Sequence, residues 1–133
     1  VQTLNPHSAA ITRASRHDYA GFAGDELAAR RMAGLPPTVR MVRIVVRDEQ
    51  HDKAHERALE VAELLREAGD ERVRVVGPMP CAISRIAGFY RFGIELTCPS
   101  PVPMQEAMGR VRERGLLKSD SRVAIDVDPI WLM

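Results

Sequence analysis

Three arginines, Arg43, Arg47 and Arg91, fall in segments where apolar and polar residues alternate. Strict alternation predicts β-strands with one apolar and one polar face, and the arginines belong to the polar face. Guanidinium groups donate paired hydrogen bonds to phosphates, and neutralising phosphates drives nucleic-acid affinity. Phe89 and Arg122, near the starts of two predicted strands, extend this set. These five residues are therefore candidates for contacting the phosphates and bases of a nucleic acid.

Acidic residues on the same strands leave a second interpretation open. Glu95, Asp126 and Asp128 would balance the arginines on a sheet face that is merely solvated. Asp126 and Asp128 also share one strand face, where paired carboxylates can bind a hard cation. We expect them instead to keep the strand end soluble, and we predict no metal there.

Two histidines, His51 and His55, are four residues apart in a predicted helix, a spacing that can hold a metal. No third ligand accompanies them, so we expect a solvated helix face that also carries Arg57. Cys81 and Cys98 lack paired-ligand spacing, which argues against a zinc site or a disulfide. The chain has neither a phosphate-binding glycine loop nor a nucleophile with its base, so we expect no catalytic residue, cofactor or metal in it.

The elements that must position these residues follow from periodicity. Strands are predicted over residues 39–47, 72–76, 89–97 and up to Pro129. One helix is predicted between Asp48, its cap, and Gly69, which ends it. A second helix is predicted around Met104–Val111, with Met104 and Met108 in the core. Gly77-Pro78-Met79-Pro80 is expected to end the second strand.

The predicted order is β-α-β-β-α-β, an α+β, ferredoxin-like sandwich: a four-stranded antiparallel sheet with two helices on one face. Parity places Ile94 and Ile125 in the core. It also turns Tyr90 and Phe92 toward the core, so that only Phe89 offers a ring to a base.

The first residues form a separate helical segment. Residues 7–33 are helical in character, and Asp18 can cap them. A loosely spaced apolar stripe consists of Tyr19, Phe22, Leu27 and Met32. Pro36-Pro37 then forces an extended backbone. We therefore divide the chain into residues 1–35 and 36–133.

Composition limits the class of protein. With 133 residues, 45% hydrophobic content and a net charge of +1, the chain suits one core plus an appendage, not a basic arm or an acidic tail. No apolar run reaches the roughly 18 residues of a membrane helix. The unpaired cysteines indicate a reducing cytosol. The opening Val1-Gln2-Thr3 reads as the end of a strand, so we interpret the chain as a fragment of a larger protein.

Short motifs occur in a specific order along nearly the whole chain. They are Val1-Gln2-Thr3, Asn5-Pro6, His17-Asp18-Tyr19, Phe22, Glu26 to Arg31, Gly34 to Pro37, Gly77-Pro78, Pro80, Ser84-Arg85-Ile86, Gly88, Tyr90-Arg91-Phe92, Pro99-Ser100 and Ile125 to Pro129. In this order they resemble the C-terminal end of the bacterial replication-restart helicase family, primosomal protein N′.

The resemblance implies an ATP-driven 3′ to 5′ DNA helicase that recognises abandoned forks and reloads the replisome in the bacterial cytoplasm. Its ATP, Mg and Zn sites would lie upstream. Residues 1–35 would be the exit from the second helicase lobe, and residues 36–133 a non-catalytic DNA-binding and docking domain. Implied partners are single-stranded or forked DNA, the protein's own helicase lobes, the single-stranded DNA-binding protein and primosome proteins, with no membrane.

One departure from the family concerns the docking of partners. Gln105 matches a family glutamine at the start of the second helix, but the basic residue that usually precedes it is Pro101, which offers no charge to an acidic tail. Two alternatives remain on the same fold. One is a free-standing RNA-binding or ribosome-associated domain, and the other is a small ligand-binding module or acylphosphatase-like enzyme.

Overall fold

The computed structural model describes residues 3–118 and 120–129, and it divides the chain into two compact units, Val1–Thr38 and Val39–Met133. No helix in the described part of the chain has both the length and the apolar character needed to cross a membrane.

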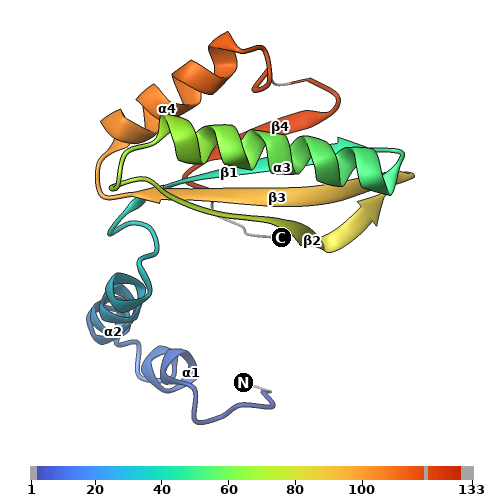
Figure 1. Ribbon diagram of the computed structural model, residues 1–133. Helices are drawn as coiled ribbons and strands as arrows, with labels where there is room; N and C mark the ends of the chain where they lie inside the picture. The colour runs from blue at the N-terminus through green and yellow to red at the C-terminus, as the bar shows by residue number, and fades with distance from the viewer. Residues whose placement is uncertain (1–2, 119, 130–133) are drawn as a thin grey trace. The chain divides into compact units, whose positions relative to one another are not determined.

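The second unit is a four-stranded antiparallel sheet covered on one face by two helices (Figure 1). Its elements are β1 (Arg40–Asp48), α3 (His51–Ala68), β2 (Arg74–Ile86), β3 (Phe89–Cys98), α4 (Pro101–Glu113) and β4 (Val123–Val127). The strand order is β2-β3-β1-β4, so the first and third strands are central. The predicted ferredoxin-like topology is confirmed.

The core lies between the sheet and the two helices. Ile44, Ile94 and Leu96 are fully buried there, and Phe92 nearly so. Met104 and Met108 of α4 complete the packing from the helix side, as predicted. Strand parity was therefore correct on the covered face.

The other predicted core isoleucine, Ile125, packs against the core but is only half-buried. The sequence prediction had placed it fully inside. It pairs with Ile44 from β4, which lies at the edge of the sheet, and an edge strand has a neighbour on one side only.

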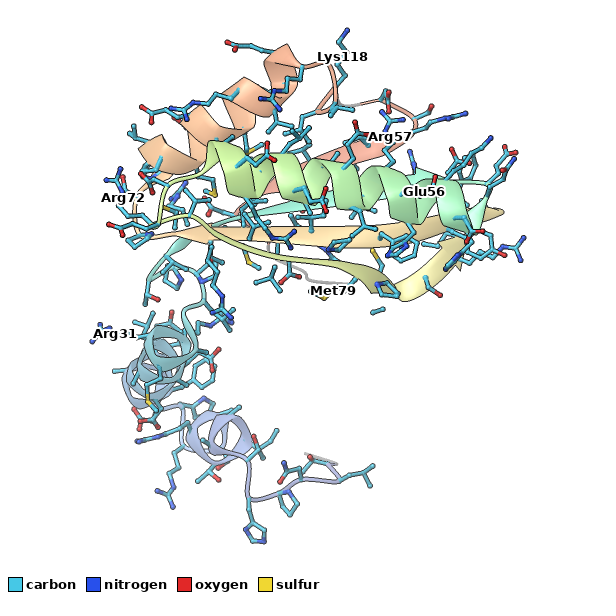
Figure 2. All side chains as sticks on the ribbon, viewed as in Figure 1. Arg31, Glu56, Arg57, Arg72, Met79 and Lys118 are labelled. Carbon is cyan, nitrogen blue, oxygen red and sulfur yellow. The ribbon has the colours of Figure 1, made fainter. Side chains whose placement is uncertain are left out.

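The second strand is longer than predicted. β2 runs through Gly77-Pro78-Met79-Pro80, the segment that we expected to end it. It does so with two register shifts against β3, between Val76 and Met79 and between Pro80 and Arg85. β2 is an edge strand, so its prolines need not donate to a neighbour, and the irregularities absorb them. Met79 consequently lies exposed on the side of the sheet away from the helices (Figure 2).

Small residues let α3 pack closely on the sheet. Ala54, Ala58 and Ala62 are fully buried on its inner face. The predicted cap, Asp48, does not cap this helix. Gln50 is the N-cap residue and makes no side-chain bond, whereas the Asp48 carboxylate accepts a hydrogen bond from the Gln50 N–H at 3.0 Å. Gly69 ends the helix, as predicted.

The fourth strand ends at Val127, so Asp128 is not on the strand face that we assigned to it. Its backbone is left-handed, with φ of 49°. The Asp128 N–H donates to the Met41 carbonyl at 2.7 Å, and its carboxylate accepts from the Met41 N–H at 3.0 Å. Asp128 also forms an ion pair with Arg40. Its role in the fold is to attach the end of β4 to the start of β1.

The first unit holds two helices separated by a break, α1 (Ala9–Ala14) and α2 (Tyr19–Ala33), both within the segment predicted to be helical over residues 7–33. The break falls at His17, whose φ is 55°, and at Asp18, which caps α2 through a 2.9 Å bond from the Gly21 N–H. The apolar stripe is not buried in this chain: Tyr19 is 78% and Met32 90% exposed.

Candidate nucleic-acid interface

Three of the five predicted DNA-contacting residues line one cavity at the end of the uncovered sheet face. Arg47 of β1 and Arg91 and Phe89 of β3 enclose a volume of about 310 Å³, together with Ile86, Ala87 and Ser121. Arg47 and Arg91 are directly opposite in the β1–β3 register, and the Arg47 guanidinium lies 6.0 Å from the centre of the Phe89 ring. We call Arg47, Phe89 and Arg91 the open-face patch.

The electrostatics of the open-face patch favour an anion. Like charges directly opposite on neighbouring strands repel each other. Among the described residues, neither arginine is in an ion pair. Each guanidinium binds only a backbone carbonyl, Arg47 that of Ser121 and Arg91 that of Ile83. Since a guanidinium has five N–H donors, most remain available to a phosphate, which would also relieve the repulsion.

The fourth candidate, Arg122, lies in the segment just before β4 and is occupied by a carboxylate. It forms an ion pair with Asp48 at 3.0 Å. The hydrogen bond from the Gln50 N–H lowers the pKa of Asp48, and the charge of Arg122 lowers it further. Nearby, hydrogen bonds from the Arg122 and Val123 N–H groups lower the pKa of Asp120. These contacts hold the entry to β4 in place.

The fifth candidate, Arg43, lies on the predicted face of the sheet but has little contact with solvent. Only 7% of Arg43 is exposed, and its Nε has no hydrogen-bond partner among the described groups. It is paired in register with Glu95 on one side and Asp126 on the other. Arg43 therefore lies apart from the open-face patch, between two acidic neighbours.

Arg57, which we placed on a solvated helix face, is only partly exposed, and its Nε is buried without a hydrogen-bond partner among the described groups. Arg114, at the C-terminal end of α4, is exposed and lies 3.9 Å from Glu67. Arg114 is therefore a suitable control position for binding experiments.

The residues of this chain do not fit the zinc or ATP sites that the resemblance places upstream. Within residues 3–118 and 120–129, no group of three or more His, Cys, Asp or Glu residues is placed to hold a metal. Cys81 and Cys98 are buried free thiols. The chain lacks a glycine-rich phosphate loop.

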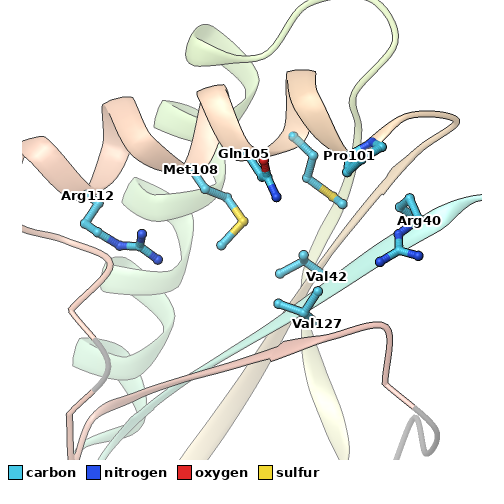
Figure 3. Close-up of a pocket in the computed structure, with 8 residues that line it drawn as sticks. Arg40, Val42, Pro101, Gln105, Met108, Arg112 and Val127 are labelled. Atoms are coloured by element: carbon cyan, nitrogen blue, oxygen red, sulfur yellow. The ribbon is translucent and has the colours of Figure 1, made fainter.

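Gln105, the predicted docking residue, lines a second pocket, of about 200 Å³, between α4 and the strands β1 and β4 (Figure 3). Its floor is apolar, formed by Val42, Val127, Met104 and Met108. Val127 is 58% exposed although it follows the apolar parity of β4. Two arginines stand at the pocket, Arg40 from β1 and Arg112 from α4, and Pro101 lies at its edge. We call this the α4 pocket.

Several residues of these two sites were not found from the sequence. Ile86, Ala87 and Ser121 come from the β2–β3 turn region and from the segment before β4, whose positions depend on register. Arg40 and Arg112 come from different elements that only the fold brings together. The one available signal was the helical spacing of Met104, Met108 and Arg112, which places them on one side of α4.

The fold and these sites define a ferredoxin-like sandwich with a basic and aromatic patch on its uncovered face and an apolar pocket with two arginines beside its second helix. The model of the primosomal protein N C-terminal domain matches residues 31–130. The chain therefore belongs to the primosomal protein N C-terminal domain family.

Individual relatives agree with this assignment. A protein named replication restart protein PriA from Treponema pallidum is 32% identical over 130 residues, which are 98% of this chain and 20% of the relative. The protein of the same name from Haemophilus influenzae is 30% identical, over 97% of this chain and 18% of its own length. The chain thus spans about a fifth of the length of these curated relatives.

A solved structure supports the fold alone. The de novo designed protein Foldit4 superposes with a TM-score of 0.50 at 16% sequence identity, covering 67% of this chain and 94% of the designed chain.

Proposed function

We propose that this chain is the non-catalytic C-terminal domain of an ATP-dependent 3′ to 5′ DNA helicase that restarts stalled replication forks in the bacterial cytoplasm, and that it contributes DNA binding and docking. The observation that carries the DNA-binding part is the open-face patch, where two arginines that form no ion pair among the described residues lie beside the half-buried Phe89 ring. Single-stranded DNA is bound in this way, by cations on the phosphates and aromatic rings under the bases.

The expected affinity is modest. A net charge of +1 gives little long-range attraction for DNA, so binding depends on local contacts. Each phosphate neutralised releases counterions, and the affinity must therefore fall as salt rises.

A salt titration of single-stranded DNA binding tests the proposal. Arg91→Gln should weaken binding about equally for different sequences and flatten the salt slope by roughly one unit, because a phosphate contact carries little base information. Arg114→Gln removes the same charge from the C-terminal end of α4, in the helix layer and not on the uncovered sheet face, and should leave the salt slope unchanged. Equal losses from both variants would contradict a specific patch. Tighter binding of RNA than of DNA with the same base sequence would favour the free-standing RNA-binding alternative.

For docking, we propose that the α4 pocket receives the acidic C-terminal tail of the single-stranded DNA-binding protein. Its apolar floor suits a hydrophobic side chain, and arginine suits a carboxylate. The position at which the family usually has a basic residue is Pro101 in this chain, and Arg40 and Arg112 supply positive charge at the same pocket. Arg40 is already paired with Asp128, so of these two arginines Arg112 is the one that forms no ion pair among the described residues.

Binding of a fluorescent acidic peptide that ends in a hydrophobic residue tests this docking. Arg112→Gln and Gln105→Ala should each weaken binding several-fold, whereas Arg114→Gln should not. An unchanged peptide affinity in Arg112→Gln would contradict docking at the α4 pocket.

The first unit supports a contact with the protein's own helicase lobes. An apolar cavity of about 580 Å³ is lined by residues of α1 and α2, among them Ile11, Tyr19 and Phe22. A monomer rarely exposes such surface without a partner. We propose that this face packs against the preceding lobe in the full-length protein, whose relatives are about five times longer than this chain.

A further inference from the structure

Three rings on the helix-covered side of the sheet form a narrow slot that the open-face patch does not include. His51 and His55 of α3 are its walls, with ring centres 6.4 Å apart and ring planes 27° from parallel. Phe92 of β3 is its floor, 5.4 Å from the His51 ring and 5.0 Å from the His55 ring. We call these three residues the histidine slot.

The helix geometry explains the slot. Residues four apart lie on one side of a helix, so the two imidazoles follow each other along α3. Ala54 and Ala58 are fully buried against the sheet, and these small residues allow both imidazoles to approach the Phe92 ring. The His51 side chain is 56% exposed, so the slot opens to solvent, while Phe92 is buried beneath it.

The width of the slot suits a planar ring. A base stacked in DNA occupies about 3.4 Å along its strand, so a base held between two rings needs about 6.8 Å between their centres. The ring centres are 6.4 Å apart, which is less than this distance, so a base can enter only if one imidazole moves outward. The exposed His51 side chain has room to do so.

The same geometry argues against a metal. The lone pairs of imidazole nitrogens lie in the ring plane, so two stacked rings do not direct them at one ion. In addition, His51 Nδ1 lies 2.9 Å from the Asp52 carboxylate, which orients this ring. The two histidines therefore present faces, not ligands.

Further contacts connect the histidine slot to an arginine, Arg85, and to the β2–β3 hairpin, which also contributes residues to the open-face cavity. Tyr90 meets His51 edge-on at 5.4 Å, and the Arg85 guanidinium lies 4.9 Å from the centre of the Tyr90 ring. The next residue along β2, Ile86, lines the open-face cavity on the other side of the sheet. Arg85 is thus placed to meet phosphate between the two sites.

We propose that the histidine slot holds one unpaired base of single-stranded DNA, stacked between His51 and His55, and that the strand then passes the β2–β3 hairpin to the open-face patch. This inference rests on the DNA-binding function proposed above. It adds a base-binding position on the helix side of the sheet and a path for the strand around the hairpin.

The test uses the whole chain and a short oligothymidylate that carries one 2-aminopurine, whose fluorescence is quenched when it stacks. His55→Ala should weaken binding by about fivefold to a hundredfold, the effect of removing one base–aromatic stack, and should abolish the quenching. His55→Phe keeps a stacking wall and should restore both. The matched control is His7→Ala, which removes an exposed histidine of the other unit.

The outcomes separate the two proposals. Full quenching and unchanged affinity in His55→Ala, with a loss in Arg91→Gln, would refute the slot and leave the open-face patch standing. Absence of DNA binding by the wild-type chain even at low salt would overturn both. A far-UV circular dichroism spectrum equal to that of the wild type confirms that each variant is folded.

Discussion

Replacing Ile94 by alanine should destabilise the second unit strongly. Ile94 is fully buried in a central strand and is paired with Ile44, which is equally buried. The substitution removes about three methyl-sized groups at about 0.8 kcal/mol each, or about 2.4 kcal/mol of transfer free energy. Neighbours on both adjacent strands and α3 cannot collapse fully into the space, and the remaining cavity raises the expected loss to about 3–4 kcal/mol.

The matched control is Ile125→Ala, the same chemical change at a half-buried position of an edge strand. We expect it to cost about 1–2 kcal/mol, because less apolar area leaves water there on folding. Urea unfolding followed by far-UV circular dichroism measures both. With a slope near 1.5 kcal/mol per M, Ile94→Ala should lower the midpoint by about 2 M. A loss for Ile94 no larger than that for Ile125 would refute the assignment of the core.

Three further predictions concern local features. Asp120→Asn should flatten the acid dependence of stability: the pKa of Asp120 is lowered by two backbone N–H groups, so its stabilisation is present above the unfolded pKa of about 3.9 and is lost as pH falls through the lower folded value. Urea midpoints at neutral and acidic pH measure this, and an unchanged pH profile would contradict it. Asp18→Ala should cost α2 about 1 kcal/mol through loss of its N-cap, seen as faster amide exchange at Gly21, while protected exchange there would argue against the cap. Gly109→Ala should stabilise α4 by about 0.5–1 kcal/mol, because an added Cβ meets no atom within 4 Å; a lower Tm would show strain instead.

Alternation was sufficient to predict the central strands. β1 and β3 each have a hydrogen-bonded neighbour on both sides and one buried face, so their side chains must alternate between core and solvent. The length of β2 could not be predicted in the same way. An edge strand tolerates proline and register shifts, and neither its length nor its irregular pairing follows from periodicity.

For the sites, parity identified the face of a residue but not its depth. It correctly grouped Arg47, Arg91 and Phe89, which now line one cavity. Parity also predicted that Arg43 contacts nucleic acid, although its position in a central strand leaves it almost no access to solvent. For His51 and His55, the sequence did not predict which residues they contact. Their spacing suggested metal ligands or a solvated face, whereas their packing on Phe92 depends on the register of α3 over β3.

The pairing of β1 with β4 determines the order in which this domain can be completed as it is synthesised. Val42 is paired with Val127, and Asp128 closes the edge at Met41, so the first strand receives its outer neighbour only from the last residues described. Until those residues leave the ribosome, one edge of β1 keeps unpaired backbone groups beside apolar side chains such as Ile44. Such an edge invites pairing with other nascent chains. Ribosomes that stall shortly before β4 should therefore release a product that aggregates, although it already contains both helices and three of the four strands of the second unit.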